Sequence, residues 1–287
     1  MKATMEYIPA YIPKGKYLYG IIRTEGDQEL GPTCLPTGQR AGLSDRLVGL
    51  RRTRVYTIGF KNIAALVSDH PLTKIKPLRE NLTSHHEVIK EAIQNFTIIP
   101  MAFGQMVRRA EEILQALEVN YPSIDQELDR LRNKVEMGLK ILWDVDNIFE
   151  YFVNRDRELR DFRDRIFGRS RQPTQGEKID LGRLFESKLS REREKHAGRV
   201  MRVLRNCTVD VKVIPPTHEK MVMNGAFLIE KGKEGLFEER VHRAAALFDG
   251  NFTFDYSGPW APHNFIELKL AELGSVSSPQ ESQFKVL

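Results

Sequence analysis

The spacing of apolar and polar residues predicts short strands and helices in the first half of the chain. Strands are expected at residues 17–23, 54–60, 63–68 and 96–103. The second and third of these form a hairpin that turns at residues 61–62. Pro100 cannot donate a hydrogen bond to a neighbouring strand, so the fourth strand belongs at a sheet edge or a bulge.

Helical spacing in this half is accompanied by two start signals. Ser84 and Glu87 form a capping-box pattern that predicts a helix from residue 84 to 95. Apolar residues at three-to-four spacing predict another helix over residues 110–117. Ser123 with Gln126 predicts the start of a third helix, which leads into the second half.

The second half alternates between strand and helix patterns in a recognisable order. Strands are expected at residues 135–143, 209–214, 222–230 and 251–256, and helices at 145–166, 179–204 and 234–248. Because GRSRQPTQG, residues 168–176, interrupts the first helical stretch, that stretch becomes a helical hairpin. The order βαββαβ predicts a ferredoxin-like domain within a two-domain α+β protein.

A chain of 287 residues is long enough for two domains, since a domain takes about 100 to 200 residues. We expect an N-terminal α+β domain over residues 1–120 that contains a long loop at 24–53 with a helical turn near 43–47. A linking helix and the ferredoxin-like domain, with its helical arm at 145–206, occupy residues 121–273. Residues 274–287 form a flexible tail rich in polar residues.

Composition narrows the function classes. No window approaches the run of about 18 apolar residues that a membrane-spanning helix needs, and prolines interrupt the N-terminal segment where a signal peptide would be apolar. We therefore expect a cytoplasmic protein that does not bind membranes. Cys34 and Cys207 match no disulfide or zinc spacing.

The net charge of +5 favours acidic partners only weakly, because 44 basic residues are balanced by 39 acidic ones. The arm segment 155–171 holds seven arginines and four acids, which indicates a solvated, ion-paired face or, alternatively, a docking arm. The exposed sheet face is predicted to carry mixed charge without stacking aromatics, at Glu136, Lys140, Asp210, Lys212, Thr253 and Asp255. Phe227 is assigned to the core. An RNA-binding sheet would place aromatic residues on the exposed face, so a nucleic-acid-binding module is the weaker alternative.

No catalytic, cofactor or metal motif is present in the sequence. His85 and His86 point about 100° apart on a helix and cannot chelate one ion together. His70 and His263 are loop candidates for a general base, but neither belongs to a pattern that supplies a nucleophile. We expect a protein that is not an enzyme and uses no cofactor.

The stretch GPWAPHNF, residues 258–265, follows the last strand and combines two prolines with large aromatic residues. Its candidate structural or partner-binding residues are Gly258, Pro259, Trp260, Pro262 and Phe265. Each proline favours an extended conformation at the residue before it, here Gly258 and Ala261, and so fixes the path of Trp260. The aromatic pair either packs the chain's exit against a domain or forms an edge that binds a partner.

Four segments in this order resemble the gas vesicle protein F/L family: YLYGI (17–21), SHHEVI (84–89), IPMAFG (99–104) and GPWAPHNF (258–265). Pro100, Phe103 and Gly104 of IPMAFG are further candidate structural or partner-binding residues. The resemblance implies a non-enzymatic accessory protein for gas vesicles, which provide buoyancy. It implies a protein that binds the small hydrophobic shell protein and other vesicle proteins during nucleation. An edge strand near Pro100 is a possible docking site for such a β-prone partner.

Overall fold

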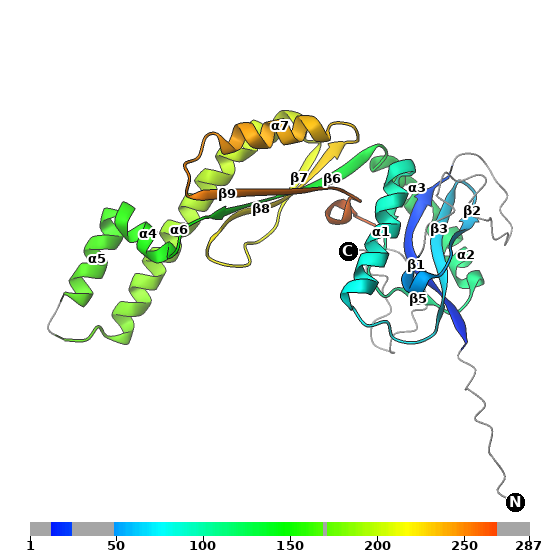
Figure 1. Cartoon of the computed structure of the whole chain (residues 1–287), viewed down its shortest axis with the longest axis horizontal. Helices are drawn as coiled ribbons and strands as arrows, with labels where there is room; N and C mark the ends of the chain where they lie inside the picture. The colour runs from blue at the N-terminus through cyan, green and yellow to red at the C-terminus, as the bar shows by residue number, and fades with distance from the viewer. Residues whose placement is uncertain (1–12, 25–48, 169–170, 269–287) are drawn as a thin grey trace, which may run out of the picture. The chain divides into compact units, whose positions relative to one another are not determined.

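The computed structural model describes residues 13–24, 49–168 and 171–268, and the chain divides into two compact units. The first unit comprises Met1–Val135 with Trp260–Leu287, and the second comprises Glu136–Pro259. Each unit contains one sheet and several helices, so the α+β class is confirmed (Figure 1). Most of the expected loop at 24–53, including its helical turn, and the tail at 274–287 lie outside the described residues.

The first unit is built on one sheet whose central strand is β1. Its strands are β1 (Lys14–Arg23), β2 (Val55–Phe60), β3 (Ile63–Pro71), β4 (Ile98–Pro100) and β5 (Met106–Val107). They are ordered β2-β3-β1-β4, and β5 also pairs with β1. The predicted hairpin is confirmed, with Phe60 opposite Ile63. Pro100 lies in the edge strand β4, as expected, although β4 has only three residues.

Helices cover both faces of this sheet, which explains why its strands are apolar on both sides. The helices are α1 (Arg79–Asn95), α2 (Ala110–Val119) and α3 (Tyr121–Arg130), with 3₁₀ turns η1 (Leu50–Arg52) and η3 (His263–Phe265). Tyr17 and Tyr19 of β1 belong to the core beneath α1. Leu18 and Ile21 point to the other face, where α2 and α3 pack.

Both predicted start signals in this unit are wrong. Helix α1 begins at Arg79, so Ser84 lies inside it, and its hydroxyl donates to the Glu80 carbonyl at 3.0 Å. Such back-bonding is available to serine inside a helix, and this is why the capping-box pattern alone did not locate the helix start. Helix α3 begins at Tyr121 with Pro122 in its first turn, and Ser123 does not cap it.

The second unit contains a sheet of four strands. They are β6 (Lys134–Trp143), β7 (Asp210–Val213), β8 (Met221–Glu230) and β9 (Phe252–Trp260), ordered β7-β8-β6-β9. The alternation predicted for β6 is confirmed in part, because Met137, Leu139 and Ile141 are buried and Lys140 is exposed. Glu136 was expected on the exposed sheet face, but it is buried, so that prediction is wrong. Phe227 is fully buried, as expected.

The helices of this unit are α4 (Ile148–Arg155), α5 (Arg157–Phe167), α6 (Gln175–Leu204) and α7 (Glu234–Ala245), with the 3₁₀ turn η2 (Arg205–Cys207). The stretch expected to be one helix at 145–166 is two, because Asp156 leaves the helical conformation and its carboxylate caps α5 by accepting the Leu159 N–H at 2.9 Å. A capping box of Thr174 and Glu177 starts α6 four residues earlier than predicted. No helix in the described ranges has the length and apolar character that a membrane crossing requires.

The last strand differs from the prediction at its end. β9 continues through Gly258 and Pro259 to Trp260 instead of stopping at Tyr256. Gly258 adopts φ +126°, so the extended conformation expected before Pro259 is wrong at this residue. A Cβ at Gly258 would lie 2.8 Å from the Glu136 carbonyl oxygen, which explains why glycine suits this position.

Candidate functional site

Four segments singled out in the sequence meet in the core of the first unit. Tyr17 and Tyr19 come from β1, and their rings contact the ring of His85 from α1. Phe103 contacts both Tyr17 and His85, with ring centroids 6.2 and 5.7 Å apart. Ala261, from the stretch after β9, is buried in the same cluster. We call Tyr17, Tyr19, His85, Phe103 and Ala261 the aromatic core cluster.

A directed chain of hydrogen bonds runs through this cluster. Nε2 of His85 lies 3.1 Å from the Met101 carbonyl, which can only accept, so Nε2 carries the proton. Nδ1 is then an acceptor, and the Tyr17 hydroxyl donates to it at 2.9 Å. The Gly104 N–H in turn donates to the Tyr17 oxygen at 3.0 Å. Each polar group in this series of hydrogen bonds therefore has a partner, as buried polar groups require.

Burial sets the protonation states in this region. It lowers the pKa of His85 to about 4, and the nearby His86 and His263 lower that pKa further, while the Met101 carbonyl opposes the shift. Burial, and then His86, also lowers the pKa of His263 to about 4. Burial raises the pKa of the Tyr17 hydroxyl. Both histidines are therefore neutral near pH 7, and His85 acts as a fixed hydrogen-bonding group.

The other histidine considered from the sequence lies elsewhere in the first unit. His70 is fully buried on β3, and its Nδ1 lies 3.1 Å from the Pro71 carbonyl. His70 and His263 thus come from different elements, β3 and η3. Within the described residues, no group of three or more His, Cys, Asp or Glu side chains is arranged to hold a metal ion.

The segment after β9 is held to α3 by a partly buried ion pair that the sequence did not reveal. Arg130 donates to both carboxylate oxygens of Glu127, at 2.7 and 2.9 Å, and its guanidinium also donates to the Phe265 carbonyl. Oε1 of Glu127 accepts the N–H of Glu267 at 2.8 Å. Only the i, i+3 spacing of Glu127 and Arg130 could have suggested the pair.

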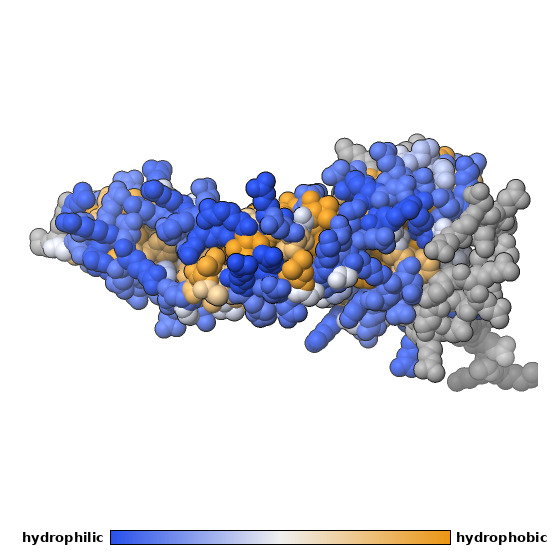
Figure 2. All heavy atoms as spheres, turned by 90° about the horizontal axis from the view of Figure 1, so that it is seen from above, coloured by the Kyte–Doolittle hydropathy of each residue, from blue (hydrophilic) through white to orange (hydrophobic). Residues whose placement is uncertain are grey.

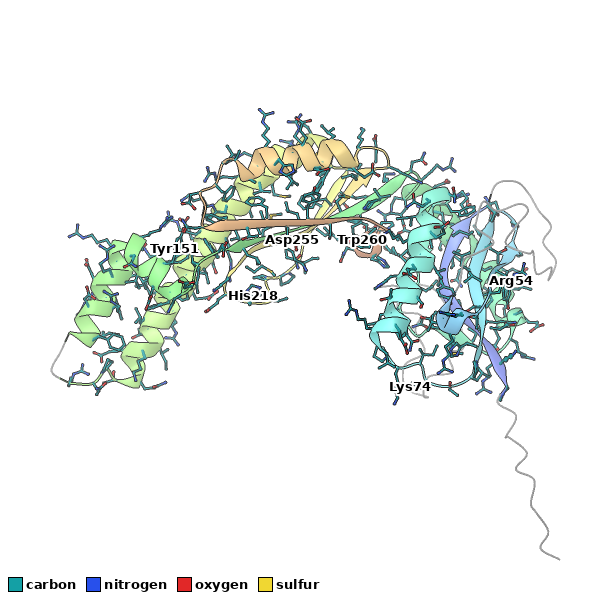
Figure 3. All side chains as sticks on the ribbon, viewed as in Figure 1. Arg54, Lys74, Tyr151, His218, Asp255 and Trp260 are labelled. Atoms are coloured by element: carbon teal, nitrogen blue, oxygen red, sulfur yellow. The ribbon has the colours of Figure 1, made fainter. Side chains whose placement is uncertain are left out.

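The candidate structural or partner-binding residues predicted from the sequence differ in how exposed they are. Pro100, Pro262 and Phe265 are buried, Phe103 and Pro259 are half-buried, and Gly104, Gly258 and Trp260 are exposed. Figure 3 shows Trp260 at the end of β9. With 41% of its surface exposed, Trp260 is the one large apolar candidate that reaches the surface. All three residues of β4 are buried, so the strand expected to offer a docking edge is covered within its own unit.

The segments of the aromatic core cluster are those on which the family resemblance depends. The gas vesicle synthesis protein GvpL/GvpF family matches residues 15–267 of this chain. The chain belongs to this family. The GvpL/GvpF match spans the described parts of both compact units almost completely, and it confirms the resemblance predicted from the four segments.

Individual GvpL/GvpF relatives cover most of the chain at low identity. Gas vesicle protein F of Nostoc sp. (strain PCC 7120) is 28% identical over 257 residues, which are 88% of this chain and 98% of that protein. Gas vesicle protein L1 of Halobacterium salinarum is 20% identical and covers 88% of this chain and 91% of that protein. The chain therefore has a gas vesicle-related role.

Solved structures of the family share the fold. The crystal structure of GvpF from Anabaena sp. PCC7120 superposes with a TM-score of 0.72 at 26% identity, covering 89% of this chain and 99% of that chain. The crystal structure of GvpF from Microcystis aeruginosa superposes with a TM-score of 0.71 at 23% identity, covering 88% of this chain and 99% of that chain. This second match shows similarity of fold.

Proposed function

We propose that this GvpL/GvpF family member is a non-enzymatic accessory protein of gas vesicle assembly in the cytoplasm. In this proposal it binds the small hydrophobic shell protein and other vesicle proteins during nucleation. The observation that carries the proposal is the family match over residues 15–267, because it includes every segment of the aromatic core cluster.

The proposal assigns the two compact units to two domains, the second of them ferredoxin-like. Counted along the chain, the second unit's strands lie in the order 2-3-1-4, with helices between the first and second strands and between the third and fourth. This order supports a ferredoxin-like domain. Helices α4, α5 and the start of α6 form the helical arm added to its first crossover.

A non-catalytic role is supported by how the first unit uses its titratable groups. Both ring nitrogens of His85 are occupied by Tyr17 and Met101, so neither is free to exchange a proton with a substrate. The Arg130–Glu127 pair holds the backbone of the C-terminal segment. These groups stabilise the fold and leave surface binding as the supported activity.

Trp260 is the proposed anchor for the shell protein. Exposed tryptophan combines a large apolar surface with one N–H donor, and such residues commonly carry much of the energy of an interface. Because β4 is buried, an interface at Trp260 is better supported than strand addition at β4.

The nucleic-acid alternative finds no support in the family comparisons. Two of the arm's arginines are paired with carboxylates of the arm: Arg163 lies 2.5 Å from Asp164, and Arg157 lies 3.6 Å from Asp161. These pairs favour the interpretation of the arm as a solvated, ion-paired face over its interpretation as a docking arm.

The direct test is retention of the purified shell protein by the full-length chain. We expect the wild-type chain to retain the shell protein and Trp260→Ala to weaken retention about thirtyfold or more, since loss of such an anchor costs ~2 kcal/mol or more. Val119→Ala is the matched control, because Val119 is an exposed apolar residue of the first unit, 61% exposed. No retention by the wild-type chain would refute the proposal, and equal retention by Trp260→Ala would remove Trp260 from it.

A further inference from the structure

The second unit contains a groove that the proposed function does not use. It has a volume of about 760 Å³ and is lined by residues of β6, α4, α6 and β9 and of the segments that follow α4 and α7. Pockets of ~300–1,000 Å³ hold ligands or anchoring side chains of partner proteins. Tyr151, labelled in Figure 3, lines the groove from α4 near the start of the helical arm.

The floor of the groove is aromatic. Trp143 and Phe152 meet edge to face with centroids 5.5 Å apart, and Phe248 and Phe252 meet in the same way at 5.0 Å. Leu247, 47% exposed, extends the apolar surface at the rim. Figure 2 shows hydrophobic atoms exposed among hydrophilic ones over the second unit. An apolar side chain placed here would contact aromatic rings on several sides.

The rim carries a row of cations along α6. Lys188, Arg191, Lys195 and Arg199 all line the groove. Their spacing of three, four and four residues places them on one helical stripe about 16 Å long. With Arg155 from α4, the five cations of the lining exceed its three carboxylates, Asp156, Glu192 and Asp249, by two charges.

Two of the five cations, Arg191 and Arg199, have no carboxylate partner among the described residues and remain available to a partner protein. The other three are paired within the unit: Lys188 with Asp156 and Glu158, Lys195 with Glu192, and Arg155 with Asp249. Arg191 is exposed and makes no ion pair or hydrogen bond with another described residue. Arg199 lies over the Phe248 ring at 5.1 Å and donates to the Leu247 carbonyl at 2.9 Å, which holds it at the rim. His196, also in the lining, has a buried Nδ1 without a hydrogen-bond partner among the described residues. The groove thus combines an apolar floor, a cationic edge and an unsatisfied polar atom.

We propose that this groove binds an acidic amphipathic helix of a partner protein. The partner's carboxylates, at three- and four-residue spacing, would face the cation row on α6, and an apolar side chain beside them would enter the aromatic floor. The length of the row favours a helix over a compact anion. The inference concerns a surface without Trp260 and is independent of the shell-protein proposal.

The test uses designed peptide probes and the full-length chain. The first probe is a labelled helical peptide of about four turns with glutamates at three- and four-residue spacing beside a leucine stripe. The second has the same composition in scrambled order, and the third is a labelled oligonucleotide of equal net charge. Fluorescence anisotropy measures the binding of each probe.

We expect the patterned peptide to bind at least about tenfold more tightly than the scrambled peptide or the oligonucleotide, and less tightly as salt is raised. Arg191→Glu with Lys195→Glu should weaken that binding about tenfold or more. The matched control is Lys178→Glu with Arg183→Glu, which reverses two exposed cations of the same helix outside the groove and should leave binding unchanged.

Equal binding of the scrambled peptide, tighter binding of the oligonucleotide, or equal losses in the two double variants would each overturn the inference. Circular dichroism of both double variants establishes that α6 remains folded. Failure of the shell protein to bind would leave these outcomes unaffected, so the two proposals fail separately.

Discussion

The Tyr17 hydroxyl donates to Nδ1 of His85 across 2.9 Å, joining β1 to α1 over a separation of 68 residues. The same hydroxyl accepts the Gly104 N–H, and the opposite nitrogen of His85 reaches Met101. One pair of side chains therefore connects three segments that share the family resemblance. These segments, which are far apart in the sequence, pack together in a single cluster.

Removal of the Tyr17 hydroxyl tests the importance of this chain of bonds. Tyr17→Phe leaves the Gly104 N–H and His85 Nδ1 without their partner, so we expect the free energy of unfolding to fall by ~1–3 kcal/mol. Urea denaturation measures the change. Tyr256→Phe is the control, because Tyr256 lies at the surface of the second unit and bonds to Glu238 in solvent. Equal effects in the two variants would show that burial of the Tyr17 network adds nothing.

Acidification should destabilise the fold before its carboxylates titrate. In the unfolded chain His85 and His263 take up protons below pH 6.5, whereas in the folded chain their pKa values lie near 4. Their contribution is complete above pH 6.5 and is lost as the pH falls toward 4, at ~1.4 kcal/mol per pH unit for each histidine. Burial lowers the pKa of His196 as well, which adds to the same trend.

Urea denaturation between pH 4.5 and 7 measures this dependence. His85→Gln should reduce the slope, and His218→Gln, at an exposed position, should leave it unchanged. A free energy of unfolding that stays constant from pH 6.5 to 4.5 would contradict the assignment of neutral, buried histidines.

The Glu127–Arg130 pair is expected to hold the segment that follows β9. Glu127→Ala removes the acceptor for both Arg130 and the Glu267 N–H, and we expect a loss of ~1–3 kcal/mol because Arg130 keeps partial access to water. Limited proteolysis should then cleave near Phe265 faster. Arg132→Ala, which breaks an exposed pair with Asp129, should change cleavage little. Unchanged proteolysis of Glu127→Ala would show that other contacts hold the segment.

Two glycine-to-alanine substitutions should change the stability of the protein in opposite directions. Gly258→Ala places a methyl group 2.8 Å from the Glu136 carbonyl oxygen at a residue with φ +126°, so we expect a loss of ~1–3 kcal/mol. Gly182→Ala introduces a methyl group with no atom within 4 Å inside α6 and should gain ~0.4–1 kcal/mol. Thermal denaturation separates the two effects. A Gly258→Ala variant as stable as wild type would mean that β9 relaxes around the new side chain.

Much of the fold follows from local patterns in the sequence. The hairpin that turns after Phe60 depends on contacts between near neighbours and is confirmed. The alternation in β6 is confirmed except at Glu136, which is buried. Helix starts were less predictable, because Ser84 has an alternative acceptor at Glu80 that the pattern does not distinguish from a cap.

The aromatic core cluster could be only partly predicted. The sequence pointed to Phe103 and Gly104 through the family resemblance, but their common partner Tyr17 is 86 and 87 positions away. No local period encodes such a contact, since it exists only after the sheet has formed. Likewise, the exposure of Trp260 and the burial of Phe265 depend on how β9 leaves its sheet.

Gas vesicle formation in the organism that encodes this chain tests the central claim most directly. Electron microscopy of cells from which only this gene has been deleted should show no vesicles, and a plasmid copy of the wild-type gene should restore them. Normal numbers of vesicles in the deletion strain would contradict the proposed role in assembly.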